Sequence, residues 1–418
     1  MNFDIYLANK LYVFVLSTLS IISIYYLATT IFHEKAHKDL IGLVAACAYI
    51  FNPWILADTY KTMVFIELSL VQTGFILFLA FTIKYFQTKK TRYSLYSGLI
   101  SSLMLSYSGL SAYRLAFFAL LGYISIAVYY LAHRFKIELS TALFDIFKGA
   151  VIVVTVSFVL NSYWIIPFVQ NASYFSSFAT GFQTPTIFNE YSTMVNTLRL
   201  MNSWSFYAGY VPYAEVFLKN PIVIALTFAW PIFAFAPLLS KKVMKNRKIL
   251  TMYVVTVLTI LLACGSEYPL GQIYMTIVNV HVGPYYFLKP FYNTGPISLL
   301  VLTLEYALLI GLFSSLVYSW FIRKSESFHP SRRKIVATFG PILIVIILAS
   351  SSWPIITGDV MRNWYNPDQY GVRIPDRYWE ANEYLEKISD LNHRTVLLPP
   401  TQTYIGTSWG VSRNLSIL

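Results

Sequence analysis

The sequence predicts an all-α polytopic membrane protein of about ten transmembrane helices, followed by a small α/β extension. Hydrophobic residues make up 56% of the 418 residues and charged residues 12%, about half the charged fraction of a typical soluble domain. The mean hydropathy is +0.57. Ten apolar runs divide the chain, most of them close to the roughly 20 residues that a helix needs to cross a bilayer. They fall near residues 11–32, 40–57, 64–83, 95–110, 114–132, 149–169, 221–239, 249–264, 296–322 and 335–353.

The Lys and Arg residues are sorted between alternate connections of these runs. Five connections are basic: residues 33–39, 84–93, 133–148, 241–248 and 323–334 hold 2, 4, 3, 5 and 5 Lys or Arg. The intervening stretches 58–63, 111–114, 171–219 and 265–293 hold 1, 1, 2 and 1. Short cytoplasmic loops collect Lys and Arg. The first set is therefore predicted to lie in the cytoplasm, and the second set and both termini outside the cell membrane.

The net charge of +12 does not indicate a nucleic-acid partner, because 19 of the 31 Lys and Arg lie in the five basic connections. Membrane topology and contact with anionic lipid in the bilayer explain them better. Cys47 and Cys264 lie within or at the end of apolar runs and lack metal-ligand spacing, so we expect neither a disulfide nor a metal site from them.

Two outward stretches, 171–219 and 265–293, are too long to be simple connections, and long irregular loops tend to carry function. The first begins with the glycosylation acceptor triplet Asn171-Ala172-Ser173, which is either used or a chance match. We therefore expect a transmembrane bundle over residues 1–353 with two functional outer loops.

Residues 354–418 form the predicted outward extension, where the composition becomes more polar, with 7 Asp or Glu and 6 Lys or Arg. A helical stripe runs from Asp376 to Ile388, and residues 395–398 followed by two prolines are typical of a short buried strand. One helix and one strand cannot make a core, so this unit must pack on the bundle or continue further.

Three acidic residues stand out. Asp58 follows the second apolar run on the outer side, and Glu67 lies near the outer edge of the third. Asp58 could act as a general base or a ligand of a divalent cation, or it could simply cap the next helix. Glu67 must face the bundle interior or a wet cavity. Glu305 lies deep in an apolar run and is either a cavity acid or a hydrogen-bonded contact between helices.

Basic residues on the outer side are scarce, so each is a candidate ligand for a phosphate. For each of them, anchoring at the membrane interface is the alternative. No nucleotide-binding, zinc-protease or nucleophile-elbow motif occurs. The outer basic residues are Lys61, Arg114, Arg199, Lys219 and Lys289.

Several stretches together resemble the GT-C class of membrane glycosyltransferases, specifically the arabinofuranosyltransferase D-like proteins and their archaeal relatives. The resemblance spans most of the chain, and its motifs are weak singly. They are Tyr49-Ile50-Phe51-Asn52-Pro53-Trp54, the stretch from Asn161 to Phe168, Phe287-Leu288-Lys289-Pro290-Phe291, and the outer segments 374–385 and 394–400.

The resemblance implies inverting transfer of a sugar from a polyprenyl-phosphate-linked donor to a glycan or glycolipid acceptor on the extracytoplasmic face. A carboxylate would deprotonate the acceptor hydroxyl. Cationic groups, or a divalent cation such as Mg²⁺, Mn²⁺ or Ca²⁺, would stabilise the departing phosphate. Lys289 matches the family position near the donor phosphate, with Lys in place of the more usual Arg.

One departure from the family pattern concerns the main catalytic acid, which in GT-C enzymes lies in the first outer loop. Here only Asp4 precedes the first apolar run in the matching region. The resemblance therefore implies that the usual first span and most of the first loop are missing. The chain would then be a piece of a longer enzyme or a catalytically altered relative.

Two other classes of function remain open. A lipid or oligosaccharide transporter or flippase would use Glu67 and Glu305 to line a path through the bundle. A noncatalytic membrane scaffold would need none of these residues.

Overall fold

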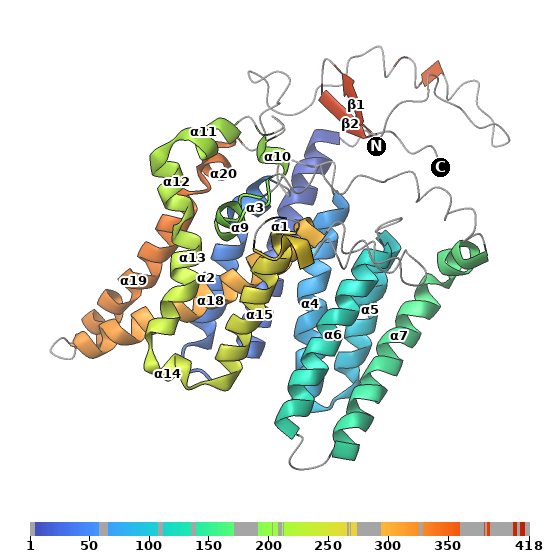
Figure 1. Ribbon diagram of the computed structural model, residues 1–418, viewed down its shortest axis with the longest axis horizontal. Coiled ribbons are helices and arrows are strands. Elements are labelled where there is room, and N and C mark those ends of the chain that lie inside the picture. Colours follow the sequence, from blue (N-terminus) through green and yellow to red (C-terminus); the bar gives the residue numbers. More distant parts are fainter. Residues whose placement is uncertain are drawn as a thin grey trace.

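The computed structural model shows a bundle of long helices capped at one end by short helices and a hairpin (Figure 1). It describes residues 5–57, 66–107, 112–134, 139–170, 191–202, 204–207, 211, 213–265, 267, 269–273, 294–325, 329–359, 380, 383–384, 404–407 and 410–413.

In their described residues, all ten predicted apolar runs are mainly helical. The long helices are α1 (Ile5–Ile31), α2 (Lys38–Ile50), α4 (Ile66–Thr88), α5 (Thr91–Tyr107), α6 (Ala112–Arg134), α7 (Leu139–Gln170), α15 (Arg247–Ala263), α18 (Thr294–Lys324) and α19 (Pro330–Ser350). Among the described residues, five helical stretches are long and apolar enough to cross a membrane. They are Phe14–Ile31, Leu139–Pro167, Pro221–Leu239, Leu299–Lys324 and Pro330–Ser350.

The seventh run is interrupted rather than continuous. It comprises α12 (Pro221–Thr227), α13 (Ala229–Phe235) and the 3₁₀ helix η5 (Ala236–Leu239). Pro231 and Pro237 lack the backbone N–H that would bond to the preceding turn. Hydropathy alone predicted one helix here, because proline changes hydropathy little while it breaks the hydrogen-bond ladder.

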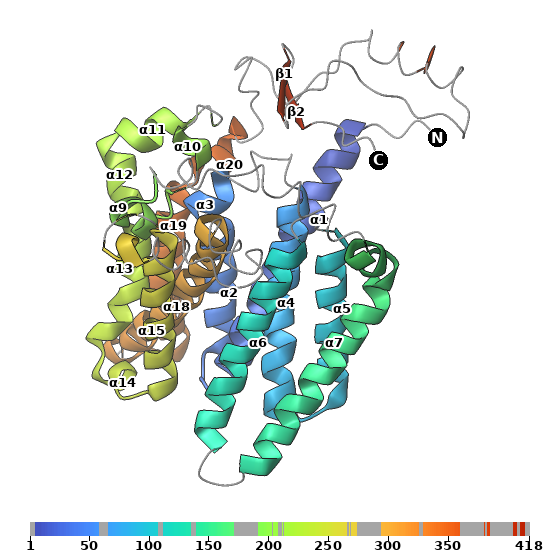
Figure 2. The same ribbon diagram turned by 45° about the vertical axis from the view of Figure 1, so that its right-hand side comes forward.

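The helices form two groups that share α4 (Figures 1 and 2). The larger hydrophobic core joins α1, α2, α13, α15, α18 and α19, and the smaller joins α4, α5, α6 and α7. Helix α4 contributes Ile76 and Ala80 to the first core, and Phe75, Phe78 and Tyr85 to the second. Since successive turns supply both cores, α4 is packed on two sides and connects the groups.

Helix α18 is the centre of the larger group. In the 18-residue apolar window of its stretch Leu299–Lys324, 72% of the residues are buried, compared with 17% in the corresponding window of Leu139–Pro167 of α7. Its Gly311 lies against α2 so closely that a Cβ there would be 2.5 Å from the carbonyl oxygen of Ile41. Small residues permit this approach in membrane helices, where close packing drives association.

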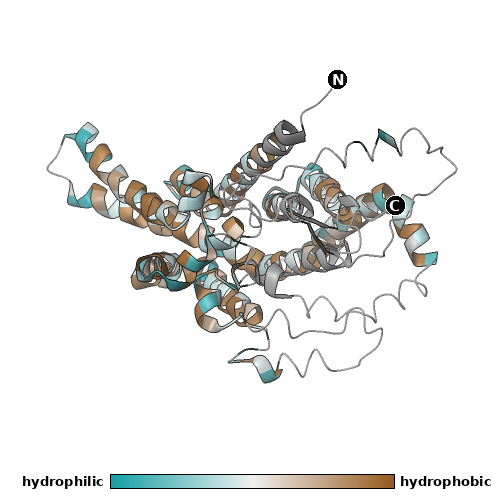
Figure 3. Ribbon diagram, turned by 90° about the horizontal axis from the view of Figure 1, so that it is seen from above, coloured by the Kyte–Doolittle hydropathy of each residue, from teal (hydrophilic) through white to brown (hydrophobic). Residues whose placement is uncertain are grey.

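The outer surface of the bundle is apolar along the helix shafts. On α7, Phe147, Val154 and Val159 are each more than half exposed. Seen along the bundle in Figure 3, the shafts are largely hydrophobic, and hydrophilic residues gather at helix ends. This is the surface that a lipid environment requires.

All five basic connections lie at the same end of the bundle, the lower end in Figure 1. We call it the basic end. It contains the α1–α2, α4–α5, α6–α7 and α18–α19 connections and α14 (Lys241–Met244). The opposite end carries α3 (Pro53–Ile55), α9 (Met194–Leu198), α10 (Trp204–Tyr207), α11 (Ala214–Lys219) and α20 (Trp353–Thr357). The described helix ends that flank the five basic connections therefore lie on one side of the bundle.

The described part of the predicted extension contains a β-hairpin that sequence patterns did not predict. Strands β1 (Tyr404–Thr407) and β2 (Gly410–Arg413) pair antiparallel, with Tyr404 opposite Arg413. The predicted strand 395–398 lies outside the described residues. Of the predicted helix 376–388, only Glu380, Glu383 and Tyr384 are described, and they are helical.

Candidate functional site

The end of α2 turns sharply into α3 through Asn52. The Asn52 side chain accepts a hydrogen bond from the Ile55 amide (2.8 Å), and its Nδ2 donates to the Tyr49 carbonyl (2.5 Å). Pro53 follows at the first helical position, where its fixed φ suits a helix start. Asn52 and Trp54 are both fully buried. The Tyr49–Trp54 motif thus builds a rigid corner at the end opposite the basic end.

Two other segments are hydrogen-bonded to this corner. The Tyr213 hydroxyl donates to the Leu56 carbonyl (3.2 Å), and the Ser352 hydroxyl donates to the Phe51 carbonyl. The Trp353 ring packs edge-on to Tyr213 at 6.3 Å. We call residues 51–57, 213–220 and 351–357 together the α3 shelf. Hydrogen bonds to backbone carbonyls at a helix end stabilise an irregular path there.

The serine run before Trp353 also connects α19 to α13. Trp230 Nε1 donates to the Ser351 hydroxyl at 3.1 Å. In contrast, the indole nitrogen of Trp54 is buried and has no hydrogen-bond partner among the described residues. Such orphaned donors are rare in folded proteins and call for an explanation, such as a ligand oxygen or water. Hydropathy gives no signal for either indole, because it does not register hydrogen bonding.

Two of the predicted site residues, Asp58 and Lys61, follow the shelf segment 51–57 in the chain. Asp58 follows the buried Ala57 in the chain, but Asp58, Lys61, Asp4 and Lys289 lie outside the described residues. Glu67 is the second residue of α4 and Arg114 the third of α6. Both helices begin at the same end of the bundle as the shelf (Figure 1). The backbone positions of Glu67 and Arg114 therefore lie at that end of the bundle.

Arg199 directly follows α9 and is buried beneath the shelf, with 7% of its surface exposed. Its Nε donates to the Thr227 hydroxyl at 2.8 Å, and its Nη2 donates to the Phe217 carbonyl at 3.3 Å. Burial lowers the pKa of Arg199, although an arginine remains charged at neutral pH. Arg199 thus places a fixed positive charge between α11 and α12.

Glu305 lies within the bundle, between α18 and α15. Its Oε1 accepts a hydrogen bond from the Thr259 hydroxyl at 3.2 Å, while Oε2 is buried without a partner among the described residues. This geometry fits the helix-to-helix contact that the sequence allowed as an alternative. The structure does not bring Glu305 together with Arg199.

Among the described residues, no group of three or more His, Cys, Asp or Glu side chains could hold a metal ion.

The motif around Asn161 builds a polar network between α5 and α7. Asn161 is fully buried, and its Nδ2 donates to the Ser102 hydroxyl and the Ser157 carbonyl, each at 2.9 Å. Its Oδ1 accepts from the Ser106 hydroxyl and from Trp164 Nε1, each at 2.8 Å. The second motif of the resemblance is therefore an interhelical contact.

Replacing Asn161 with alanine is expected to destabilise the α5–α7 contact by about 1–3 kcal/mol, since several buried groups lose their partner. Thermal unfolding of the purified protein in detergent would measure this change. Ser162→Ala is the matched control, because among the described residues the Ser162 hydroxyl bonds within its own helix, to the Val159 carbonyl. Equal unfolding temperatures for the two variants would contradict the proposed role of the network.

Comparison with known families gives one match: the N-terminal GT-C domain of alpha-(1->3)-arabinofuranosyltransferase, over residues 2–417. The chain belongs to this family. No curated protein and no solved structure matches the chain. The resemblance drawn from the Tyr49–Trp54 and Asn161 motifs is thereby confirmed.

The GT-C domain is a membrane glycosyltransferase domain. That the chain belongs to this family favours the transferase function over the transporter function. Its family and its five long apolar helices indicate a multi-pass membrane protein. A sugar donor and a glycan acceptor follow from the family.

Proposed function

We propose that the GT-C domain transfers an arabinofuranosyl group from a polyprenyl-phosphate-linked donor to a hydroxyl of a glycan or glycolipid. The linkage named in the family description is α-(1→3). The acceptor oxygen forms a bond to the anomeric carbon as the bond from that carbon to the phosphate oxygen breaks. The acceptor proton passes to a carboxylate, and polyprenyl phosphate leaves. Inversion at the anomeric carbon follows from this single displacement.

The proposed topology has ten helices crossing the bilayer, with the basic end in the cytoplasm and the α3 shelf outside. The sorting of Lys and Arg supports this orientation. Both termini, and the extension 354–418 with its hairpin, would then be extracytoplasmic. A donor phosphate at the outer interface would meet the shelf, where an apolar polyprenyl tail can remain in the bilayer.

The observation that carries the proposal is the α3 shelf itself, from which the chain leads into Asp58. We assign Asp58 the role of general base, with Glu67 and Asp4 as further carboxylates of the site. Lys289, Arg114 and Lys61 would contact the phosphate. Arg199 is already bonded to Thr227 and Phe217, so it would stabilise the phosphate charge through the field of its guanidinium rather than by direct contact.

The test uses membranes that contain the full chain, a radiolabelled polyprenyl-phosphate arabinofuranose and an oligosaccharide acceptor. Transfer of label to the acceptor, with an α-(1→3) linkage by NMR, is the expected result. Adding a chelator tests the divalent cation, since a required metal would make transfer depend on added Mg²⁺, Mn²⁺ or Ca²⁺.

The transporter alternative predicts a different outcome in the same membranes. A transporter would move labelled lipid across sealed vesicles without transferring its sugar, and Glu305→Gln would abolish that movement. For the transferase, Glu305→Gln should preserve activity, because the amide oxygen can still accept the hydrogen bond from Thr259. Movement of lipid with no transfer to any acceptor would overturn the proposed function.

A further inference from the structure

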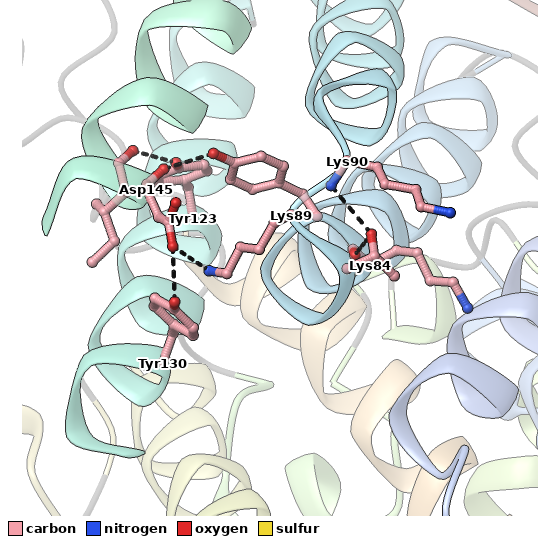
Figure 4. Close-up of polar contacts among 9 residues, drawn as sticks. Lys84, Lys89, Lys90, Tyr123, Tyr130 and Asp145 are labelled. Atoms are coloured by element: carbon pink, nitrogen blue, oxygen red, sulfur yellow. Dashed lines mark hydrogen bonds and ion pairs between the residues drawn. The ribbon is translucent and has the colours of Figure 1, made fainter. Parts of the chain in front are cut away.

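Residues 84–93, which join α4 to α5 at the basic end, include four basic residues. One of them, Lys89, forms an ion pair. Lys89 Nζ lies 2.8 Å from Asp145 Oδ2 on α7 and 3.5 Å from the centroid of the Tyr130 ring. The Tyr130 hydroxyl also donates to Asp145 Oδ2 at 3.0 Å. Figure 4 shows Lys89 pointing toward Asp145. Asp145 is therefore already neutralised.

The other three basic residues of the connection are Lys84, Lys90 and Arg92. Lys84 and Lys90 extend to the side away from Asp145 (Figure 4). Lys89 adopts a left-handed conformation with φ of 59°, which reverses the chain direction after α4 and sends the neighbouring lysine the other way. None of the three forms an ion pair with a carboxylate in the described part of the chain. They are three positive charges without a carboxylate partner among the described residues, one at the end of α4, one in the connection and one at the start of α5.

The Thr88 side chain fixes the backbone at the two lysines. The Thr88 hydroxyl donates to the Lys84 carbonyl at 2.8 Å and accepts from the Lys90 amide at 3.4 Å. Arg92 Nη2 donates to the Tyr93 hydroxyl at 3.3 Å, and this bond is the main cause that lowers the pKa of Tyr93. The charges of Lys84 and Lys90 lower it further, against the effect of burial. The three cations thus act together around Tyr93.

Aromatic rings continue from this point toward the apolar shafts of α1, α4 and α5. Tyr93 packs against Tyr96 (6.3 Å between centroids), Tyr96 against Phe81 (5.3 Å), and Phe81 against Tyr26 (5.6 Å). Beyond them Leu99 is 45% exposed. Tyrosines are enriched where the bilayer meets water. The surface therefore runs from cations through aromatic rings to exposed aliphatic side chains.

We propose that this surface binds one anionic phospholipid, whose headgroup phosphate is held by Lys84, Lys90 and Arg92. The order of the surface matches such a lipid: a charged headgroup, a glycerol region at the tyrosines, and hydrocarbon chains along α5. Arginine can contact two phosphate oxygens at once, and the lysines add point charges. A soluble phosphate ion would use only the cations and gain nothing from the aromatic and aliphatic parts.

The experiment measures lipid retention by native mass spectrometry of the full chain, released from detergent with either phosphatidylglycerol or phosphatidylcholine. The test variant replaces Lys84, Lys90 and Arg92 with glutamine. The matched control replaces Lys241, Lys242 and Arg247, three exposed cations at the same end, so that both variants lose the same charge. A third arm adds inorganic phosphate as a competitor.

The test variant should lose affinity for phosphatidylglycerol by about 100-fold, because it removes three cations and each contributes about 1 kcal/mol to anionic lipid binding. The control should keep the affinity of the unmodified chain, and phosphatidylcholine should bind weakly to all three. Equal losses in the test and control variants would overturn the site in favour of general charge attraction. Full displacement of the lipid by millimolar phosphate would also overturn the proposal, because it would show that the surface recognises the phosphate alone. If the triple variant fails to fold, the exposed single substitution Lys90→Glu gives the same comparison.

Discussion

Replacing Asp58 with asparagine is expected to lower the rate of sugar transfer by about 10²- to 10⁴-fold, the contribution typical of a positioned general base. Asparagine keeps the size and the hydrogen-bonding oxygen of the side chain but cannot take the acceptor proton. The fall should appear in kcat, because proton transfer belongs to the reaction step rather than to binding. Initial rates of label transfer in membranes, at saturating donor, would measure it.

Asp39→Asn is the control for this substitution. Asp39 is an exposed acid at the basic end that accepts a hydrogen bond from the Tyr25 hydroxyl at 2.9 Å, so its loss should leave transfer unchanged. If Asp58→Asn retains full activity, another carboxylate acts as the base. Glu67→Gln and Asp4→Asn would then identify which one does.

Lys289→Ala tests the phosphate side of the same site. Its loss should reduce transfer by about 10²-fold, comparable to removing one group that stabilises charge in a transition state. Lys219 offers the comparison, since it is exposed and already paired with Glu215 at 2.7 Å. Equal activities of Lys289→Ala and Lys219→Ala would remove Lys289 from the site.

Replacing Trp54 with alanine is expected to destabilise the protein by about 3–5 kcal/mol, the usual cost of truncating a buried tryptophan. Trp54 is fully buried at the corner that joins α2 to the α3 shelf. Loss of its ring leaves a cavity beneath the segment that leads into Asp58. Thermal unfolding in detergent would measure the change in stability, and the transfer assay should show activity lost with it.

Trp54→Phe separates packing from hydrogen bonding at the same position. It keeps most of the ring volume and removes an indole N–H that has no partner among the described residues. Stability should therefore change little. If that N–H serves a substrate oxygen, transfer should fall even though the protein remains folded. Trp230→Phe is the contrasting variant, because it breaks a formed bond to Ser351 and should lower stability instead. Full stability of Trp54→Ala would show that the corner does not depend on this ring.

The helical architecture could be predicted from sequence because its physical cause is local. A run of apolar residues must satisfy its backbone groups within itself in a bilayer, so a helix follows. The charges at its ends then divide the connections between two sides. The interruption at Phe228 was not anticipated, because hydropathy does not register the missing N–H of Pro231. The hairpin was missed for a related reason: Tyr404–Thr407 and Gly410–Arg413 are short and only partly apolar.

The candidate site could be predicted only as a set of residue types on one side. Its construction depends on contacts between distant segments, such as the bond from Tyr213 to the Leu56 carbonyl. No local pattern encodes such a pair. Arg199 illustrates the difference: as a scarce outer cation it is a candidate phosphate ligand, yet the structure bonds it to Thr227 and Phe217. Burial and partners separate these roles, and neither is visible in the sequence around it.

The central position of α18 has a consequence for the order in which the protein is made. Helices α4 to α7 pack mainly on their sequence neighbours, so this group can assemble soon after residue 170 emerges from the ribosome. Helices α2, α13 and α15 instead pack against α18, which is synthesised more than 240 residues after α2 ends. Until α18 inserts, the face of α2 that packs against Gly311 is covered by lipid or a chaperone instead. The larger half of the GT-C domain is therefore completed late in synthesis, and a ribosome stalled before residue 294 should leave the α4–α7 group, with α1 packed on α4, more resistant to protease than α13 and α15.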